Sequence, residues 1–458
     1  MPEIIDVAHF LADKLGRYHA DHIEIHLEET ESSAISYRGR ELETATRSRD
    51  AGGNVRALVN GGWGFVSFNS LVDVERRIER AVEQAKLVGG AGSKFAAAPR
   101  SITEITIDED HDPRLVSLAE KKALLDEYNE ALWSVPGLQT SVIGYGDSRK
   151  RSILINSDGS FINQERADIT LRTNAVAAGD GEVQQSGVSM GSRGRFESIR
   201  GLHDRVKESA EMAVALLKAP QAKGGEYTVV LDPVLAGVFV HEAFGHLSEA
   251  DHIYENPQLK EVMVLGREFG DEHLNIIDDA TLPDLRGSYA FDDEGTPAQR
   301  IHLIREGKLT GRLHSRETAA EMKETASGNA RAISFRHPPI VRMSNTYIEP
   351  SDTTFEQMIG DIKEGIYARN WYGGTTSMEM FTFSAGEAFM IRNGKVEEMI
   401  RPVVLSGNVF DTLKRIDAIG DDLDMNQGGG CGKGGQSPLA VSNGSPHIRI
   451  QRCLIGGR

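Results

Sequence analysis

The stretch Val229–Asp251, VVLDPVLAGVFVHEAFGHLSEAD, joins a strand-forming run directly to a helix-forming run. Its first residues are β-branched and apolar, which favours a buried strand. Asp232 is a suitable N-cap and Pro233 suits the first helical position, so the sequence predicts a helix that begins at Pro233. The apolar residues that follow predict that this helix is half-buried, with the polar segment His241–His246 at its end.

The two histidines of this segment, His241 and His246, are five positions apart. Four residues advance an α-helix by about 400°, but five advance it by about 500° and leave the two side chains about 140° apart. On a regular helix the pair cannot easily share a ligand. A π-bulge or a break in the helix realigns them, and Gly245 tolerates such an irregularity. A shared ligand therefore predicts irregular helix geometry between His241 and His246.

The segment His-Glu-x-x-x-His is one residue longer than the zinc-protease signature His-Glu-x-x-His. Imidazole is a zinc ligand, and a carboxylate in the position of Glu242 can hold a water molecule and take its proton. The alternative is coincidence, because the chain has 14 histidines. The spacing alone leaves a metal site and a chance arrangement equally open.

A catalytic zinc site usually has three protein ligands, so a third is needed. Glu249, Asp251 and His252 are close in sequence, and Cys431 is a remote candidate in the glycine-rich run 424–438, DMNQGGGCGKGGQSP. That run does not match a phosphate-binding loop, which needs a glycine five residues earlier and a Ser or Thr after the lysine. The second cysteine, Cys453, lies in an alternating pattern that predicts a core strand.

Length and composition narrow the class of protein. A chain of 458 residues predicts two domains, and a net charge of −17 argues against nucleic-acid binding. The amino terminus lacks the pattern of a secretory signal, and no apolar run reaches the ~18 residues that a membrane-spanning helix requires. Only two cysteines occur, which suits a reducing compartment. We expect a cytoplasmic enzyme.

Residues 1–222 contain the same predicted order twice, a helix, antiparallel strands and a second helix, which indicates an internal duplication. The four helices are expected at residues 4–15, 71–88, 114–134 and 204–219. After the Pro- and Gly-containing segment near residue 222, hairpins are expected at 300–315 and 386–405, the latter with a type I′ turn at Asn393-Gly394. The prediction is an α+β protein: an α/β N-terminal domain (1–222) and a β-rich C-terminal domain (223–458) that carries the metal-site helix.

Five separated stretches together resemble the TldD/PmbA peptidases, and within that family they resemble the TldD-type members. They are 37–69 (YRGRELETATRSRDAGGNVRALVNGGWGFVSFN), 241–246 (HEAFGH), 287–300 (GSYAFDDEGTPAQR), 381–395 (FTFSAGEAFMIRNGK) and 428–437 (GGGCGKGGQS). The resemblance implies a zinc site with the ligands His241, His246 and Cys431 and the catalytic carboxylate Glu242. It also implies a dimer, possibly with a TldE/PmbA-like subunit, that encloses the site and admits small or unfolded peptides.

These observations favour a zinc-dependent peptidase, with a non-catalytic peptide-binding subunit or regulator of proteolysis as the alternative. The peptide is expected along a strand edge, for which Gly373 and Gly374 mark one candidate position. Tyr289 and His314 are candidates for stabilising the reaction intermediate, although a structural role is favoured for both. The acidic run Asp292–Glu294 is interpreted as a solvated turn, so no second metal is assigned.

Overall fold

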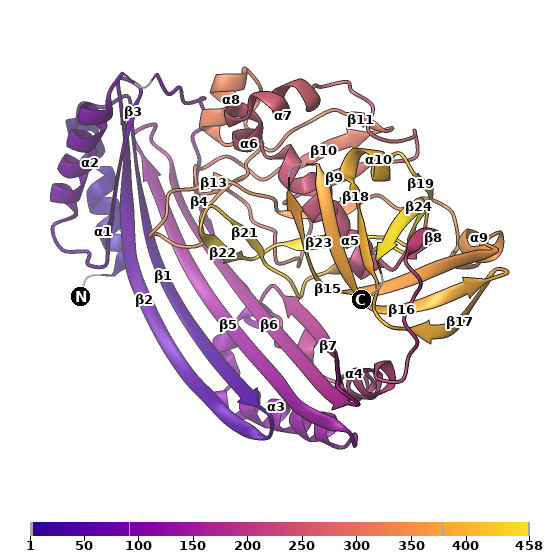
Figure 1. The fold of residues 1–458 in the computed structure, drawn as a ribbon. Helices are drawn as coiled ribbons and strands as arrows, with labels where there is room; N and C mark the ends of the chain where they lie inside the picture. The colour runs from indigo at the N-terminus through magenta and orange to yellow at the C-terminus, as the bar shows by residue number, and fades with distance from the viewer. Residues whose placement is uncertain (1–2, 91, 378, 457–458) are drawn as a thin grey trace.

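The computed structural model describes residues 3–90, 92–377 and 379–456 and confirms the α+β class. A long curved sheet is built by the N-terminal part of the chain, and two further large sheets are built by the C-terminal part. In Figure 1 the long strands β1 (His22–Arg38), β2 (Glu41–Val59), β5 (Leu138–Asn156) and β6 (Phe161–Gly179) arc along one side of the C-terminal part, which contains helix α5 (Pro233–Val240).

The N-terminal sheet contains the predicted order twice. The first copy consists of α1 (Ile4–Ala12), β1 (His22–Arg38), β2 (Glu41–Val59), β3 (Gly62–Phe68) and α2 (Val74–Val88). The second consists of α3 (Leu118–Trp133), β5 (Leu138–Asn156), β6 (Phe161–Gly179), β7 (Glu182–Ser192) and α4 (His203–Leu216). The two copies meet where β1 pairs antiparallel with β5, so both belong to one sheet. The short strand β4 (Ile102–Ile105) adds parallel to β6.

The helices of the two copies are held against this sheet by separate apolar cores. In α2 the buried residues recur every three or four positions, as a one-sided helix requires. Those side chains join the core formed by α1 and the strands β1–β3, whereas α3 and α4 share a second core with β5, β6 and β7.

The larger C-terminal sheet has the strand order β15-β8-β24-β18-β16-β17, with β19 paired to β24. Its strands are β8 (Gly225–Leu231), β15 (Glu364–Ser377), β16 (Met380–Arg392), β17 (Lys395–Ile400), β18 (Val404–Asn408), β19 (Ile416–Ile419) and β24 (Ile448–Gly456). The predicted type I′ turn between β16 and β17 is confirmed, because Asn393 and Gly394 both have positive φ.

The second C-terminal sheet has the order β11-β10-β9-β14-β23-β20. Its strands are β9 (Ile276–Asp279), β10 (Arg300–Arg305), β11 (Lys308–Leu309), β14 (Asn345–Ile348), β20 (Asp424–Asn426) and β23 (Ser442–Ser445). Two small hairpins are β12 (Ala330–Arg331) with β13 (Ile340–Val341), and β21 (Cys431–Lys433) with β22 (Gln436–Leu439). The helices of this part are α5 (Pro233–Val240), α6 (Ala250–Glu255), α7 (Pro257–Val262), α8 (Arg316–Met322), α9 (Phe355–Gly360) and α10 (Val409–Leu413).

Helix α5 lies between the two large C-terminal sheets, against β15 on one side and β23 on the other. All residues from Leu235 to Val240 are therefore buried. The prediction of a half-buried helix was wrong, because sheets cover α5 on two sides and leave it no solvent-facing stripe.

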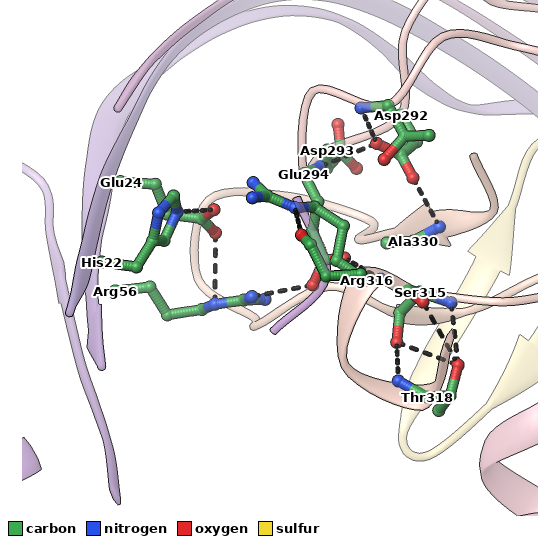
Figure 2. A network of polar contacts seen from close by, with 12 residues as sticks. His22, Glu24, Arg56, Asp292, Asp293, Glu294, Ser315, Arg316, Thr318 and Ala330 are labelled. Atoms are coloured by element: carbon green, nitrogen blue, oxygen red, sulfur yellow. Dashed lines mark hydrogen bonds and ion pairs between the residues drawn. The ribbon is translucent and has the colours of Figure 1, made fainter. Parts of the chain in front are cut away.

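A buried network of charges joins the N-terminal sheet to the C-terminal part (Figure 2). The Arg56 guanidinium, from β2, lies 3.1 Å from Glu24 and donates to Glu294 at 2.7 Å. The second carboxylate oxygen of Glu294 accepts a hydrogen bond from the Arg316 backbone N–H. Buried charges are tolerated when each has a partner of this kind, and losing one partner is costly.

The acidic run Asp292–Glu294 is thus not a solvated turn, and that interpretation was wrong. Asp292 is buried and accepts hydrogen bonds from three backbone N–H groups, those of Glu294, Thr296 and Ala330. Its role is to fold the loop back on itself, while Glu294 faces Arg56 across the junction (Figure 2). Three consecutive acidic residues do not by themselves indicate burial. Here the burial depends on Arg56, which belongs to the distant N-terminal sheet.

Candidate metal centre

The metal-site segment begins as predicted. The Asp232 carboxylate accepts a hydrogen bond from the Leu235 N–H at 2.9 Å, and Pro233 occupies the first turn of α5. After Val240 the chain forms a π-helical turn, His241–Gly245, in which the His246 N–H donates to the His241 carbonyl. The expected irregularity is therefore present, and it takes up the extra residue between the histidines.

Gly245 serves this turn through packing. Its φ is −56°, an ordinary helical value, so no unusual backbone conformation calls for glycine. A Cβ atom at this position would lie 2.1 Å from the Met343 sulfur, which means that any side chain would force the two segments apart. Close approach of Met343 is what requires glycine here.

The structure brings His241, His246 and Cys431 together. One ligand atom from each lies within 4.8 Å of the others, and the Cys431 Sγ is 3.5 Å from the His246 Nε2. The two imidazole rings are nearly perpendicular, with centroids 5.2 Å apart. His246 and Cys431 are 185 positions apart in the chain, so this convergence is a product of the tertiary fold.

The charges of this cluster suit a cation. Burial alone would raise the pKa of the Cys431 thiol, but His241 and His246 outweigh it and bring that pKa down to about 5. Burial alone would lower the pKa of His246, but the charges of Glu249 and Cys431 raise it well above the usual value. The buried Nδ1 of His241 has no hydrogen-bond partner among the described residues. Two imidazoles and a thiolate form a donor set that zinc accepts, so these residues fit the ion.

Glu242 lies at the edge of the cluster. Its carboxylate is 4.0 Å from the His246 Nε2, the nitrogen that faces Cys431. Its side chain is 32% exposed, whereas His241 as a whole is 3% exposed. Glu242 therefore contacts both the ligand cluster and the solvent side, where a substrate would arrive.

The opposite nitrogen of His246 faces Glu249. The His246 Nδ1 lies 3.0 Å from the Glu249 carboxylate, which is completely buried and 3.0 Å from the Lys433 ammonium. Burial alone would raise the pKa of Glu249, but His246 and Lys433 lower it to about 2. Glu249 is therefore an anion that orients the His246 ring, as carboxylates commonly do behind metal-binding histidines.

The candidates for a third ligand that are close to the histidines in sequence are less suitable than Cys431. Glu249, Asp251 and His252 do cluster within 4.8 Å. However, the Lys433 ammonium donates to both carboxylate oxygens of Asp251 and lies 3.0 Å from Glu249, so a cation is already supplied by the chain. His252 is 44% exposed on its side chain. The arrangement favours Cys431 over these three residues.

The loop before Cys431 is held by residues that the sequence did not single out. The Arg286 guanidinium donates to the carbonyls of Gln427 and Gly429, and pairs with Asp168 of β6. The Gly428 carbonyl accepts hydrogen bonds from Arg172 of β6 and Ser189 of β7. Arg342, completely buried, donates to the Cys431 carbonyl at 2.8 Å. No local pattern marks these residues, because each reaches the loop from a distant part of the chain.

The remaining candidates have other contacts. Tyr289 is buried and donates to the Gly328 carbonyl, and His314 is buried between Thr318 and Glu324. These contacts agree with the structural role favoured for both. Gly373 and Gly374 lie in β15, where Gly374 packs closely on Phe383 of β16.

Comparisons with known proteins identify the family. Models of the PmbA/TldA metallopeptidase match residues 23–86 (domain 1), 111–217 (central domain) and 224–457 (C-terminal domain). The chain belongs to this metallopeptidase family. It is 47% identical to the metalloprotease slr0863 of Synechocystis, over 98% of this chain and 97% of that protein. It is 30% identical to a zinc metalloprotease TldD homolog of Saccharolobus solfataricus, over 89% of this chain and 90% of that protein.

Among solved structures, TldE from Thermococcus kodakarensis has the same fold, with a TM-score of 0.76 over 99% of this chain and 100% of that one. The two share 18% sequence identity, so this likeness concerns the fold alone. No helix in the described part of this metallopeptidase combines the length and the apolar character that crossing a membrane requires.

Proposed function

We propose that this protein is a zinc-dependent peptidase that hydrolyses small or unfolded peptides, with His241, His246 and Cys431 as metal ligands and Glu242 as general base. The observation that carries the proposal is the convergence of three zinc-type ligand atoms within 4.8 Å, from segments 185 positions apart, beside a partly exposed carboxylate. The names of its relatives agree with a metal-dependent peptidase.

In this proposal Glu242, Glu249 and Cys431 have different roles. When bound, a zinc ion would polarise the scissile carbonyl and make water more acidic. Glu242 would take a proton from the attacking water and pass it to the departing amine. Glu249 would keep the His246 Nε2 directed toward the cluster by accepting from Nδ1. Cys431 would supply a thiolate at neutral pH, since its pKa is about 5.

The substrate would lie extended along β15. This strand lies beside the π-helical turn that carries the histidines. On one side β15 pairs with β16 as far as Ser377. On the other side its pairing with β8 ends at Ala368 and the Asn370 N–H donates to Asp232, so among the described residues the edge beyond Asn370 has no strand neighbour and could accept a peptide. Main-chain pairing of this kind tolerates many sequences, which suits unfolded substrates.

Assembly is part of the proposal. The resemblance to the TldD/PmbA peptidases supports a dimer, either of this chain or with a TldE/PmbA-like subunit. A cytoplasmic location and a domain boundary at residue 222, which separates 1–222 from 223–458, stay predictions from the sequence.

The test compares wild type with Glu242→Gln and Cys431→Ser. Zinc per chain is measured first, and cleavage of an unfolded protein is then followed by mass spectrometry. We expect about one zinc in wild type and in Glu242→Gln, with cleavage lowered about 10²–10⁴-fold in Glu242→Gln. Normal cleavage by Glu242→Gln would show that another group is the base. A zinc-free, inactive wild type would refute the proposal and favour a non-catalytic subunit.

A further inference from the structure

A cavity of about 360 Å³ lies between the hairpin β10–β11 and the segment that follows α8. Its walls are formed by residues of the segments 299–305, 310–314 and 324–327. Figure 1 shows β10 and β11 near the top of the C-terminal part. The volume is within the range of small-molecule sites. The cavity is separate from the metal centre, since its described lining contains none of the proposed metal ligands.

The lining of this cavity carries more positive than negative charge. The guanidinium groups of Arg300, Arg305 and Arg312 line it, together with the imidazoles of two histidines. Glu324 is the only carboxylate among its described lining residues. The whole chain has a net charge of −17, so an excess of cations here does not follow from the general composition. Such a local excess concentrates anions.

The inner wall of the cavity is buried and preformed. Arg312 and His314 are 8% and 2% exposed. The Glu324 carboxylate pairs with both, and it lies 3.0 Å from the His314 Nε2. Glu324 is therefore committed to the inner wall. The two arginines nearer to solvent, Arg300 and Arg305, have no carboxylate of the lining left to pair with.

Arg305 and His302 contact each other, and neither has an ion pair with a carboxylate among the described residues. The Arg305 Nη2 lies 3.1 Å from the His302 Nδ1 and 3.4 Å from its Nε2. A nitrogen nearly equidistant from both ring nitrogens is in line with neither lone pair, so the contact is not a well-directed hydrogen bond. Arg300 pairs with Glu349 at the surface, where an ion pair is worth little and is easily exchanged.

The electrostatics of His302 reflect these neighbours. The pKa of His302 is lowered by burial and then by the charges of Arg305 and Arg300, while Glu349 opposes them. The imidazole therefore lies near two cations that disfavour its protonated form. A bound anion would offset both guanidinium charges and favour the protonated ring.

We propose that this cavity binds a phosphate group, held by Arg300, Arg305 and the His302 ring. Guanidinium groups bind phosphate oxygens through paired hydrogen bonds, and a doubly charged anion suits two arginines. The Thr310 hydroxyl, which donates to the His302 carbonyl, belongs to the same wall. The cavity is larger than a phosphate ion, so the group is either free phosphate or part of a small phosphate ester. The inference rests neither on the metal centre nor on the proposed function.

The first test titrates the full-length protein with inorganic phosphate and, separately, with AMP, by calorimetry at constant ionic strength. We expect saturable binding with a Kd of about 1 mM or tighter. Arg305→Gln, at an exposed position, should weaken it by about tenfold or more. Arg452→Gln, at an exposed arginine of β24, is the control and should bind like wild type. Tighter binding of AMP would indicate an ester, and tighter binding of inorganic phosphate would indicate the free ion.

The second test follows the pKa of His302 by NMR, with His302→Gln used to assign its signals. Phosphate should raise this pKa in wild type, because a bound anion favours the protonated ring. Arg305→Gln should raise the pKa of His302 without phosphate and should reduce the further rise that phosphate causes. A purely structural role of Arg305 would not produce this pattern.

Three results would overturn the proposal. They are no saturable binding of either probe, binding that Arg305→Gln leaves unchanged, and acetate binding as tight as that of phosphate. Cys431→Ser distinguishes this cavity from the metal centre, because it should bind phosphate like wild type whatever its zinc content. Loss of phosphate binding in Cys431→Ser, with normal binding in Arg305→Gln, would place the anion at the metal centre instead.

Discussion

The helix that carries His241 and His246 and the loop that carries Cys431 reach the metal centre in different ways. The helix is positioned by its own surroundings: an N-cap, a π-helical turn and burial of α5 between two sheets. The loop 427–430 has no helix or strand of its own and is held by arginine and serine side chains from distant segments. One pair of candidate ligands is therefore organised locally, and the third candidate ligand is organised by the whole fold.

This difference connects the metal centre to the N-terminal sheet. Arg172 and Ser189 belong to β6 and β7, and Asp168 of β6 anchors Arg286. The sheet thus contacts the backbone that precedes Cys431. If the sheet moved away, the loop would lose two side-chain partners, Arg172 and Ser189, and Arg286 would lose its pair with Asp168, while the histidine helix kept its own contacts. Zinc affinity should therefore depend on how the N-terminal sheet packs against the loop that precedes Cys431.

The largest effect is expected from removing a ligand on either side. Cys431→Ser removes the proposed ligand of the loop, and His246→Ala removes one proposed ligand of the helix. We expect each to weaken zinc binding by more than about 100-fold, which exceeds the usual cost of changing an outer residue. Competition with a chromophoric chelator measures the affinity. Cys453→Ala, at the second buried cysteine, is the control, and equal zinc affinity in Cys431→Ser and wild type would exclude the loop from the site.

A smaller effect is expected from Glu249→Gln on the helix side. The change removes the charge that orients His246, while Lys433 keeps its contacts with Asp251. Loss of such a partner usually weakens metal binding by about 10–100-fold. The same competition assay measures it, with the exposed Glu255→Gln as control. An unchanged affinity would show that the helix holds His246 without help from this carboxylate.

Acid should weaken zinc binding by about tenfold per pH unit near neutrality. The pKa of His246 is raised well above its usual value, so this ring must release a proton when zinc binds. The pKa of Cys431 is about 5, so this residue is already a thiolate at pH 7. Zinc binding would release a second proton, from the Cys431 thiol, only below about pH 5. Affinity should therefore rise with pH up to the pKa of His246. Calorimetry in buffers of different ionisation enthalpy should find about one proton released per zinc, and no proton release would contradict the charged His246.

The smallest effect is expected from Arg286→Met. This change removes two hydrogen bonds to the loop backbone but no ligand, so we expect zinc affinity to fall by about tenfold or less. Alkylation of Cys431 in the zinc-free protein gives an independent measure of loop order and should change in rate. Arg452→Met, at an exposed arginine in β24, is the control. If Arg286→Met left both the zinc affinity and the alkylation rate of Cys431 unchanged, contacts from distant segments would not be what holds the loop.

Much of the local structure was predictable, because it depends on neighbouring residues. The start of α5 at Pro233, the irregular turn after His241 and the Asn393-Gly394 hairpin all follow from short-range preferences. The burial of α5 and of Asp292 was not predictable, since it depends on which sheets and which arginine lie against them. Lys433 was noticed only as part of a loop pattern that fails, yet it is the cation that holds Glu249.

By itself the sequence determined the helix, its cap, the need for an irregular turn and the chemistry of two imidazoles beside a carboxylate. The residues alone named Cys431, Glu249, Asp251 and His252 as candidates for a third ligand, and the family resemblance implied Cys431. Only the tertiary structure distinguishes these four, by placing Lys433 against the acidic pair and the Cys431 thiol 3.5 Å from His246. The physical reason is range: a helical turn is specified by residues a few positions apart, whereas a contact across 185 positions exists only once both sheets have packed.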